Sequence, residues 1–122
     1  AGADRKHSQV VKVDWLQATS GIGMKPVASI GLDIAGEKFE AAACGNGPVD
    51  ASINALRQIV KRQITIIEYT IQGVNKGSDD CCKVHMQVEH EGKRYFGFAA
   101  STDIVTASVE AYVDCINKIH SL

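Results

Sequence analysis

The chain has 122 residues, of which 45% are hydrophobic and 22% are charged, and its formal net charge is −1 at neutral pH. This length and composition suit one soluble globular domain, and the balanced charge provides no basic field for binding nucleic acid. No apolar run approaches the roughly 20 residues that a membrane span requires, and no signal peptide is visible. The four cysteines form neither a CxxC pair nor a disulfide framework, so we expect reduced thiols and a cytoplasmic protein.

The first half of the chain predicts three strands. Val10–Gln17 is rich in β-branched and aromatic residues, and a turn at Ser20–Gly23 follows it. From Ala28 onward, apolar residues alternate with polar or small ones, which is typical of a strand with one buried face. Ala35–Lys38 then predicts a tight hairpin turn into a third strand, Phe39–Cys44.

A glycine-rich turn, Gly45-Asn46-Gly47, leads from this strand into a predicted helix, Pro48–Lys61. Asn46 or Gly47 suits the N-cap of the helix, and Asp50 lies near the positive end of its dipole. Two glycines allow backbone N–H groups to approach a ligand at the helix N-terminus closely. The pattern indicates either a well-capped strand-to-helix turn or a place for a small carboxylate or phosphate, with Asp50 available for a cation.

The second half repeats this plan without a gap, at an offset of 56 residues (92 − 36), so that Gly36 aligns with Gly92 and Ser52 with Ser108. Its predicted elements are a strand at Ile64–Val74, a loop at Asn75–Asp80, a strand around Val84–Val88, a turn at His90–Lys93, a strand at Tyr95–Ala100 and a helix from Thr102 or Asp103 to about His120. The sequence therefore predicts an α+β fold of two pseudo-symmetric β-β-β-α units, related by a pseudo-twofold, with each helix packed on an antiparallel sheet. We expect a flexible N-terminal segment, residues 1–8, and a single domain, residues 9–122, made of repeats 9–63 and 64–120.

No catalytic constellation is visible in the sequence, which lacks a nucleophile–base pattern, an HExxH motif and a P-loop. Cys81, Cys82 and His85 are poorly placed to bind a metal, because adjacent strand residues point to opposite faces. His90 and His120 are expected in a solvated turn and a solvated tail. We therefore predict no catalytic residue, no metal and no cofactor in this chain.

Three segments, in this order and at this spacing, resemble the C-terminal regulatory domain of bacterial 2-isopropylmalate synthases: Gly45–Ala51, Glu68-Tyr69 and Thr102–Ser108. The resemblance extends over roughly Gln9–Ile119, and the regulatory domains of citramalate synthases are similar. It implies a homodimerising allosteric domain that binds the end product of its pathway as a feedback inhibitor, leucine in the first case and isoleucine in the second. It also implies a parent acyltransferase whose metal-dependent catalytic barrel is absent from these 122 residues.

The resemblance further implies an effector pocket at the helix starts. Carried over residue by residue, the effector-binding residues are Gly45, Asn46, Gly47 and Asp50 at the first helix, Ile66 and Tyr69 on the following strand, and Ile104 at the second helix. The turn before the second helix lacks glycine, so the two helix starts need not bind an effector equally well.

Two other classes of function are left open by the sequence. A small standalone enzyme would use Asp50, Asp103 and Tyr69 as acid–base groups, but no His, Cys or Lys lies near the helix starts to support it. A purely structural dimerisation module would bind no amino acid. We favour a leucine-binding regulatory domain that forms a symmetric dimer, since Trp15, Tyr69 and the long strands present more apolar surface than two helices can cover.

Overall fold

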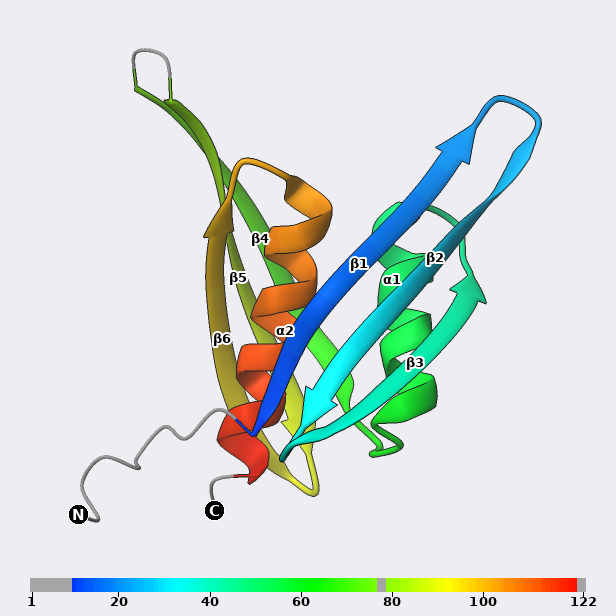
Figure 1. Cartoon of the computed structure of the whole chain (residues 1–122). Coiled ribbons are helices and arrows are strands. Elements are labelled where there is room, and N and C mark those ends of the chain that lie inside the picture. Colours follow the sequence, from blue (N-terminus) through cyan, green and yellow to red (C-terminus); the bar gives the residue numbers. More distant parts are fainter. Residues whose placement is uncertain (1–9, 77–78, 121–122) are drawn as a thin grey trace. The chain divides into compact units, whose positions relative to one another are not determined.

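Figure 1 shows the computed structural model of the chain, which describes residues 10–76 and 79–120. Its elements are, in order, β1 (Val11–Gly21), β2 (Met24–Ile34), β3 (Glu37–Cys44), α1 (Pro48–Ile59), β4 (Thr65–Lys76), β5 (Asp79–His90), β6 (Lys93–Ser101) and α2 (Ile104–His120). The strands form two sheets of three, in the orders β1-β2-β3 and β4-β5-β6. The predicted α+β fold of two β-β-β-α units is confirmed, and the predicted flexible segment 1–8 lies outside the described residues.

The chain divides into two compact units, which we call the first unit (Lys12–Arg62) and the second unit (from Gln63 onward, together with the residues up to Val11). Asn117 on α2 explains why Val11 groups with the second unit. Its Oδ1 accepts a hydrogen bond from Val11 N at 2.7 Å, and its Nδ2 donates to Val11 O at 3.0 Å. Both main-chain polar groups of this buried residue are thereby satisfied by one carboxamide.

Matching two-residue turns connect the last two strands of each sheet. Ala35 and Gly36 have φ values of 53° and 94°, and Glu91 and Gly92 have φ values of 53° and 80°. Positive φ at both central residues is the mark of a type I′ hairpin, whose twist matches that of the flanking strands. The two predicted hairpins are confirmed, and they occupy equivalent places in the duplicated units.

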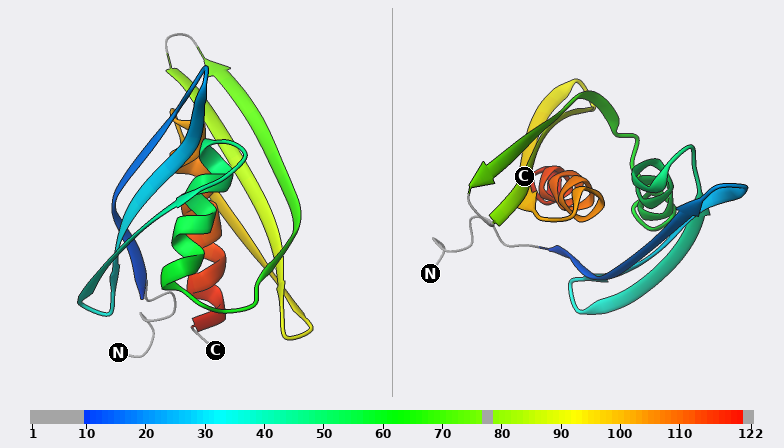
Figure 2. Two further views of the ribbon diagram at one scale, coloured as in Figure 1. Left: turned by 90° about the vertical axis from the view of Figure 1, so that its right-hand side faces the viewer. Right: turned by 90° about the horizontal axis from the view of Figure 1, so that it is seen from above.

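The cores of the two units are built from residues at matching positions. The helix-facing side of each central strand is fully buried, and so is a stripe on each helix. The strand residues are Ala28, Ile30 and Leu32 in β2 and Val84, Met86 and Val88 in β5; the helix residues are Ala51, Ser52, Ile53, Ala55 and Leu56 in α1 and Ala107, Ser108, Val109, Ala111 and Tyr112 in α2. Each helix lies against the last two strands of its own sheet, α1 on β2 and β3 and α2 on β5 and β6 (Figure 2).

The predicted loop at Asn75–Asp80 is wrong, because β4 continues through Lys76 and β5 begins at Asp79. In the first unit, the ends of β1 and α1 also differ from the predictions. β1 continues through Gly21, so the turn shrinks to Ile22-Gly23, where Gly23 supplies the positive φ of 77°. α1 ends at Ile59 instead of Lys61, because Val60 takes an extended conformation with φ −97° and ψ 96°. Both ends depend on the backbone conformation of single residues, which the spacing of apolar residues does not predict.

The prediction that His90 lies at the solvated surface is wrong. The side chain is buried, with 8% exposure, and its Nδ1 lies 3.1 Å from the carbonyl oxygen of Gln63. A hydrogen-bond partner removes most of the cost of burying an imidazole, so the ring can pack at the end of β5. The side chain of His120, for which a solvated tail was predicted, lies outside the described part of the chain.

Gly97 on β6 marks the closest approach of α2 to its sheet. A Cβ at this position would overlap the carbonyl oxygen of Ala111 and come within 2.6 Å of Cys115 Sγ. We expect Gly97→Ala to lower the free energy of unfolding by about 1–3 kcal/mol, because the helix has to move away. Gly73→Ala in β4 is the matched control, since a Cβ there has no atom within 4 Å. Equilibrium denaturation that found the two variants equally stable would contradict this close approach.

Candidate effector-binding site

The turn between β3 and α1 brings together four of the predicted site residues, Gly45, Asn46, Gly47 and Asp50. Asp50 Oδ2 accepts a hydrogen bond from Asn46 N at 2.9 Å, and Gly45 N donates to Pro26 O at 3.2 Å. These bonds fix the turn to both α1 and β2. An exposed carboxylate is thereby held beside the N-terminal N–H groups of a helix.

Packing explains the presence of glycine at only one of the two glycine positions in this turn. A Cβ on Gly45 would lie 2.5 Å from Ala51 N and 2.7 Å from Asp50 Oδ2, so the turn closes only around glycine. Gly47 is the N-cap of α1 and has an extended backbone, with φ −164° and ψ 177°, which any residue adopts. A Cβ on Gly47 would meet no atom within 4 Å. Packing among the described residues therefore requires glycine at position 45 but not at position 47.

The start of α2 shows how the same fold caps a helix with its own side chain. Asp103 stands at the position equivalent to Gly47 (103 − 56 = 47). Its Oδ1 accepts a hydrogen bond from Val105 N at 3.3 Å, and its Oδ2 accepts one from Thr106 Oγ1 at 2.8 Å. At α1, by contrast, the N-cap residue makes no side-chain hydrogen bond. The first N–H groups of α1, at the positive end of its dipole, are therefore suited to donate hydrogen bonds to an external carboxylate.

The remaining three predicted site residues lie in the second unit, where Ser108 links Tyr69 to the start of α2. Tyr69 Oη lies 2.5 Å from Ser108 Oγ, and Ser108 Oγ donates to Ile104 O at 2.8 Å. Because Ser108 has one hydroxyl proton, Tyr69 is the donor in the first bond. Ile66 lies on the same face of β4, opposite the buried Val88. Tyr69 is thus not a core residue: it is 38% exposed and its orientation is fixed by its hydroxyl.

Ser108 is the hydrogen-bond partner of Tyr69 that the sequence did not predict. The signal was present in the duplication, since Ser52 and Ser108 occupy equivalent positions and are both buried. Ser52 Oγ donates to Pro48 O at 2.7 Å, just as Ser108 bonds the carbonyl four residues earlier. A serine that is buried in both copies indicates a hydroxyl with a partner in each helix.

Several of the polar side chains considered for chemistry already have partners in the described residues. Asp103 is engaged as a helix cap and the Tyr69 hydroxyl is bonded to Ser108. Burial, and to a lesser extent the nearby Asp114 carboxylate, raise the pKa of the Cys115 thiol to about 12, so it stays protonated at neutral pH and is a poor nucleophile.

In residues 10–76 and 79–120, no group of three or more His, Cys, Asp or Glu side chains is placed to hold a metal ion. Nor does any helix in these ranges have the length and apolarity to cross a bilayer.

The described residues form a small α+β domain of two duplicated β-β-β-α units. The chain belongs to the LeuA allosteric (dimerisation) domain family, whose model matches residues 2–120. It is 53% identical over 118 residues to the 2-isopropylmalate synthase of Parabacteroides distasonis, covering 96% of this chain and 24% of that protein. The 2-isopropylmalate synthases of Heliobacterium modesticaldum and Trichodesmium erythraeum are 36% and 34% identical over 115 residues, covering 94% and 93% of this chain. The chain spans between 21% and 24% of the length of these curated relatives.

The unequal roles of the two glycines predict unequal effects of the same substitution. We expect Gly45→Ala to lower the free energy of unfolding by about 1–3 kcal/mol, because the new Cβ clashes with Ala51 N and Asp50 Oδ2. Gly47→Ala should change it by no more than about 1 kcal/mol, which is the cost of a poorer N-cap residue. Urea denaturation of the two variants measures the difference. A Gly45→Ala variant as stable as the parent would show that the turn can open to admit a side chain.

Proposed function

We propose that this chain is the leucine-binding regulatory and dimerisation domain of a cytoplasmic 2-isopropylmalate synthase, and that residues 9–122 act as one domain. The relatives named above carry that enzyme name, and the family is described as allosteric and dimerising. The observation that carries the proposal is the start of α1, where the N-cap glycine leaves backbone donors beside an exposed carboxylate. In this proposal, catalysis belongs to a barrel outside these residues, and leucine acts on it as a feedback inhibitor.

The proposed leucine carboxylate binds at backbone N–H groups near Gly47. A helix N-terminus supplies fixed partial positive charge there, so no mobile basic side chain is needed. Packing does not require glycine at position 47, but the missing Cβ leaves room for the carboxylate to approach. The same site would reject an amine that has no carboxylate, because its N–H groups would then have no acceptor.

The proposed partner of the leucine ammonium is Asp50. One of its oxygens already accepts the Asn46 N–H. A carboxylate has about four lone-pair sites, so it can hold the turn and bind an ammonium at once. The Asp50 side chain therefore links the shape of the turn to the presence of the ligand. A keto acid, which lacks the ammonium, would lose this pairing.

The proposed wall for the isobutyl group is formed by Ile66, Tyr69 and Ile104. All three are only partly buried, so apolar surface is available for a ligand to cover. The hydroxyl of Tyr69 is fixed by Ser108 over the first turn of α2, which keeps the ring from rotating away. A wall of fixed shape can distinguish leucine from isoleucine, which differ in the place of one methyl group, by about 1–3 kcal/mol.

Regulation requires that leucine bind one arrangement of the dimer more tightly than another, because a ligand with equal affinity for both shifts nothing. A coupling free energy of about 1–3 kcal/mol would be typical of an allosteric protein.

Replacing Gly47 by the residue that α2 carries at the same position tests the carboxylate site. Gly47→Asp should cap α1 and stabilise the fold by roughly a few tenths of a kcal/mol. It should also weaken leucine binding at least about tenfold. The new carboxylate would accept hydrogen bonds from the N–H groups that the ligand needs, and its negative charge would repel the ligand carboxylate. Isothermal titration calorimetry with leucine, isoleucine and valine measures the affinities, and thermal unfolding without ligand measures the stability. The control is Glu40→Gln on the exposed side of β3, which should bind leucine like the parent.

Asp50→Asn tests the ammonium site separately. The amide oxygen can still accept the Asn46 N–H, so the melting temperature without ligand should stay within a few degrees of the parent. Leucine affinity should fall at least about tenfold, because the negative charge is removed. If both variants stay folded and bind leucine as tightly as the parent, the pocket lies elsewhere. If the parent binds none of the three amino acids, the chain is a structural dimerisation module.

A further inference from the structure

We propose that Asn46 is a site of spontaneous covalent modification, at which the side-chain carboxamide is lost as ammonia and a carboxylate takes its place. Asn46 and Gly47 follow one another in the turn before α1. The modification itself rests on the local structure of this turn. Its effect on effector binding rests in addition on the proposed function, because the turn is part of the proposed leucine site.

The reaction needs only water besides the chain. The main-chain nitrogen of Gly47 bonds to Cγ of Asn46, and the side-chain nitrogen takes up the proton of that main-chain nitrogen and leaves as ammonia. The product is a cyclic imide, which water then opens at one of its two carbonyl carbons. Opening at Cγ gives aspartate. Opening at the main-chain carbon gives isoaspartate, in which the chain continues through the side-chain carbon.

The attacking nitrogen has no competing partner. Gly47 is the N-cap of α1, and its N–H donates no hydrogen bond within residues 10–76 and 79–120. Glycine has no Cβ, and the place where a Cβ would stand has no atom within 4 Å. Nothing on Gly47 therefore obstructs the approach of the Asn46 side chain to the main-chain nitrogen.

The carboxamide of Asn46 is also free to react. The residue is exposed, and its side chain makes no hydrogen bond with the part of the chain that the structure describes. Only its main-chain N–H is held, by Asp50 Oδ2 at 2.9 Å. That bond restrains the main chain before the Cα atom and leaves the side-chain torsions unrestrained. Cγ can therefore turn toward Gly47 N without breaking a side-chain contact.

Asn54 lies in the same unit and lacks both conditions. Its Nδ2 donates a hydrogen bond to Cys44 O at 3.0 Å, so the carboxamide is held. Asn54 lies within α1, where the N–H of the next residue, Ala55, belongs to the hydrogen-bond ladder of the helix. An imide at this position would require a turn of helix to open first.

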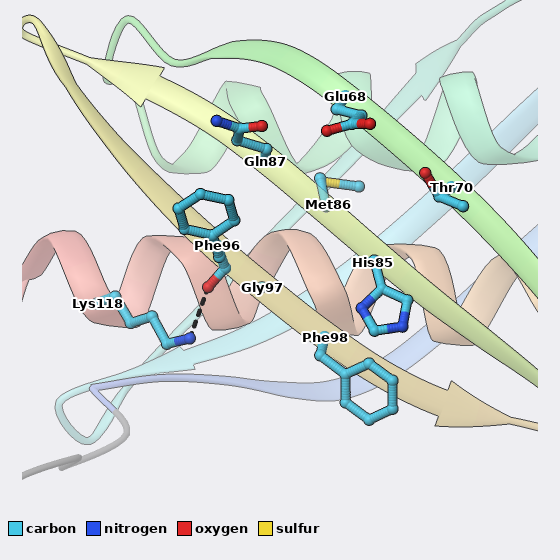
Figure 3. A pocket seen from close by; sticks show the side chains of 9 residues that line it. All are labelled: Glu68, Thr70, His85, Met86, Gln87, Phe96, Gly97, Phe98 and Lys118. Atoms are coloured by element: carbon cyan, nitrogen blue, oxygen red, sulfur yellow. Dashed lines mark hydrogen bonds between the residues drawn. The ribbon is translucent and has the colours of Figure 1, made fainter.

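Asn117 in α2 is restrained in the same way. Both ends of its carboxamide are bonded to the main chain of Val11, at 2.7 and 3.0 Å. The next residue, Lys118, lies in the helix as well, and its Nζ donates to Phe96 O at 2.6 Å beside a hollow of about 300 Å³ (Figure 3). Asn54 and Asn117 are therefore internal references against which the reactivity of Asn46 can be measured.

The duplication shows that the fold does not depend on the Asn46-Gly47 pair. The equivalent residues in the second unit are Thr102 and Asp103, which provide neither a carboxamide nor a glycine. A helix nevertheless begins directly after both turns. The reactive pair is thus a property of the first turn alone, and it can be changed without removing the fold.

Both products change the charge beside α1. The new carboxylate at position 46 lies near that of Asp50, at the positive end of the helix dipole, where negative charge favours the folded state. The same charge would repel the proposed leucine carboxylate and compete for its N–H donors. Isoaspartate also inserts one carbon into the main chain before Gly47, which shifts the N-cap relative to Asp50. The modification should therefore weaken leucine binding while the chain stays folded.

Ageing the 122-residue chain in a mildly alkaline buffer tests the chemistry without any ligand. Peptides are prepared at acidic pH, and mass spectrometry should find loss of ammonia and gain of water at Asn46 at least about tenfold faster than at Asn54 or Asn117. The rate should rise with pH, because the attacking nitrogen must lose its proton. An isoaspartyl methyltransferase should label the same peptide. Equal rates at the three asparagines would overturn the assigned site.

Gly47→Ala tests the role of the open glycine. A Cβ at this position has free space in the fold but stands beside the attacking nitrogen. The variant should slow the loss of ammonia from Asn46 by at least about tenfold, and thermal unfolding checks that it is folded. Asn46→Gln should also prevent the loss at this position, because its longer side chain would have to close a larger ring. An unchanged rate in folded Gly47→Ala would contradict the mechanism.

Calorimetry with leucine measures the consequence. A parent chain in which most of Asn46 has been converted should bind leucine at least about tenfold more weakly than fresh chain. Asn46→Asp supplies the charge without the inserted carbon, and aged Gly47→Ala should keep whatever affinity it had when fresh. Conversion of Asn46 with unchanged leucine affinity would overturn the effect on the effector. A fresh parent that binds no leucine would instead overturn the proposed function and leave the modification standing.

Discussion

One helix in each unit has to bury a face of three strands, and its width suffices for two. α2 lies on β5 and β6, and α1 lies on β2 and β3. On β4, the large side chains of Ile67, Tyr69 and Ile71 are consequently 38–44% exposed. This uncovered strand is the source of the proposed effector wall, because a wider helical layer would bury Tyr69 and leave no apolar surface for a ligand.

Much of the fold follows from local patterns in the sequence. Alternation at Ala28–Leu32 and Val84–Val88 indicates a strand with one buried side, and a glycine four residues after each run indicates the hairpin. The burial of His90 could not be predicted in this way, because it depends on the carbonyl of Gln63, 27 positions earlier in the chain. A polar side chain in a turn is expected in solvent, and the sequence alone does not show that a distant main-chain carbonyl can pair with it and allow its burial.

The candidate site was predictable in one respect and not in another. The aligned pair Gly47 and Asp103 can be read from the sequence, and aspartate is a favourable N-cap whereas glycine offers no acceptor. The different needs of Gly45 and Gly47 could not be read, because they depend on the separation of Gly45 from Ala51 N across the turn. The seven predicted site residues themselves came from the resemblance to regulatory domains. The structure groups them as four in one unit and three in the other.

The Asn117 bonds to Val11 have a consequence for the order of folding. They join residues 106 positions apart, whereas the hairpins and the helix docking within each unit join close neighbours. Closing a loop of this length costs about 4 kcal/mol of chain entropy, and two hydrogen bonds return only about 2 kcal/mol. The cost is offset only when burial of the Val11 side chain adds its own roughly 2 kcal/mol, which requires that α2 be docked. The start of the first strand is therefore secured last, and native-state hydrogen exchange should begin there.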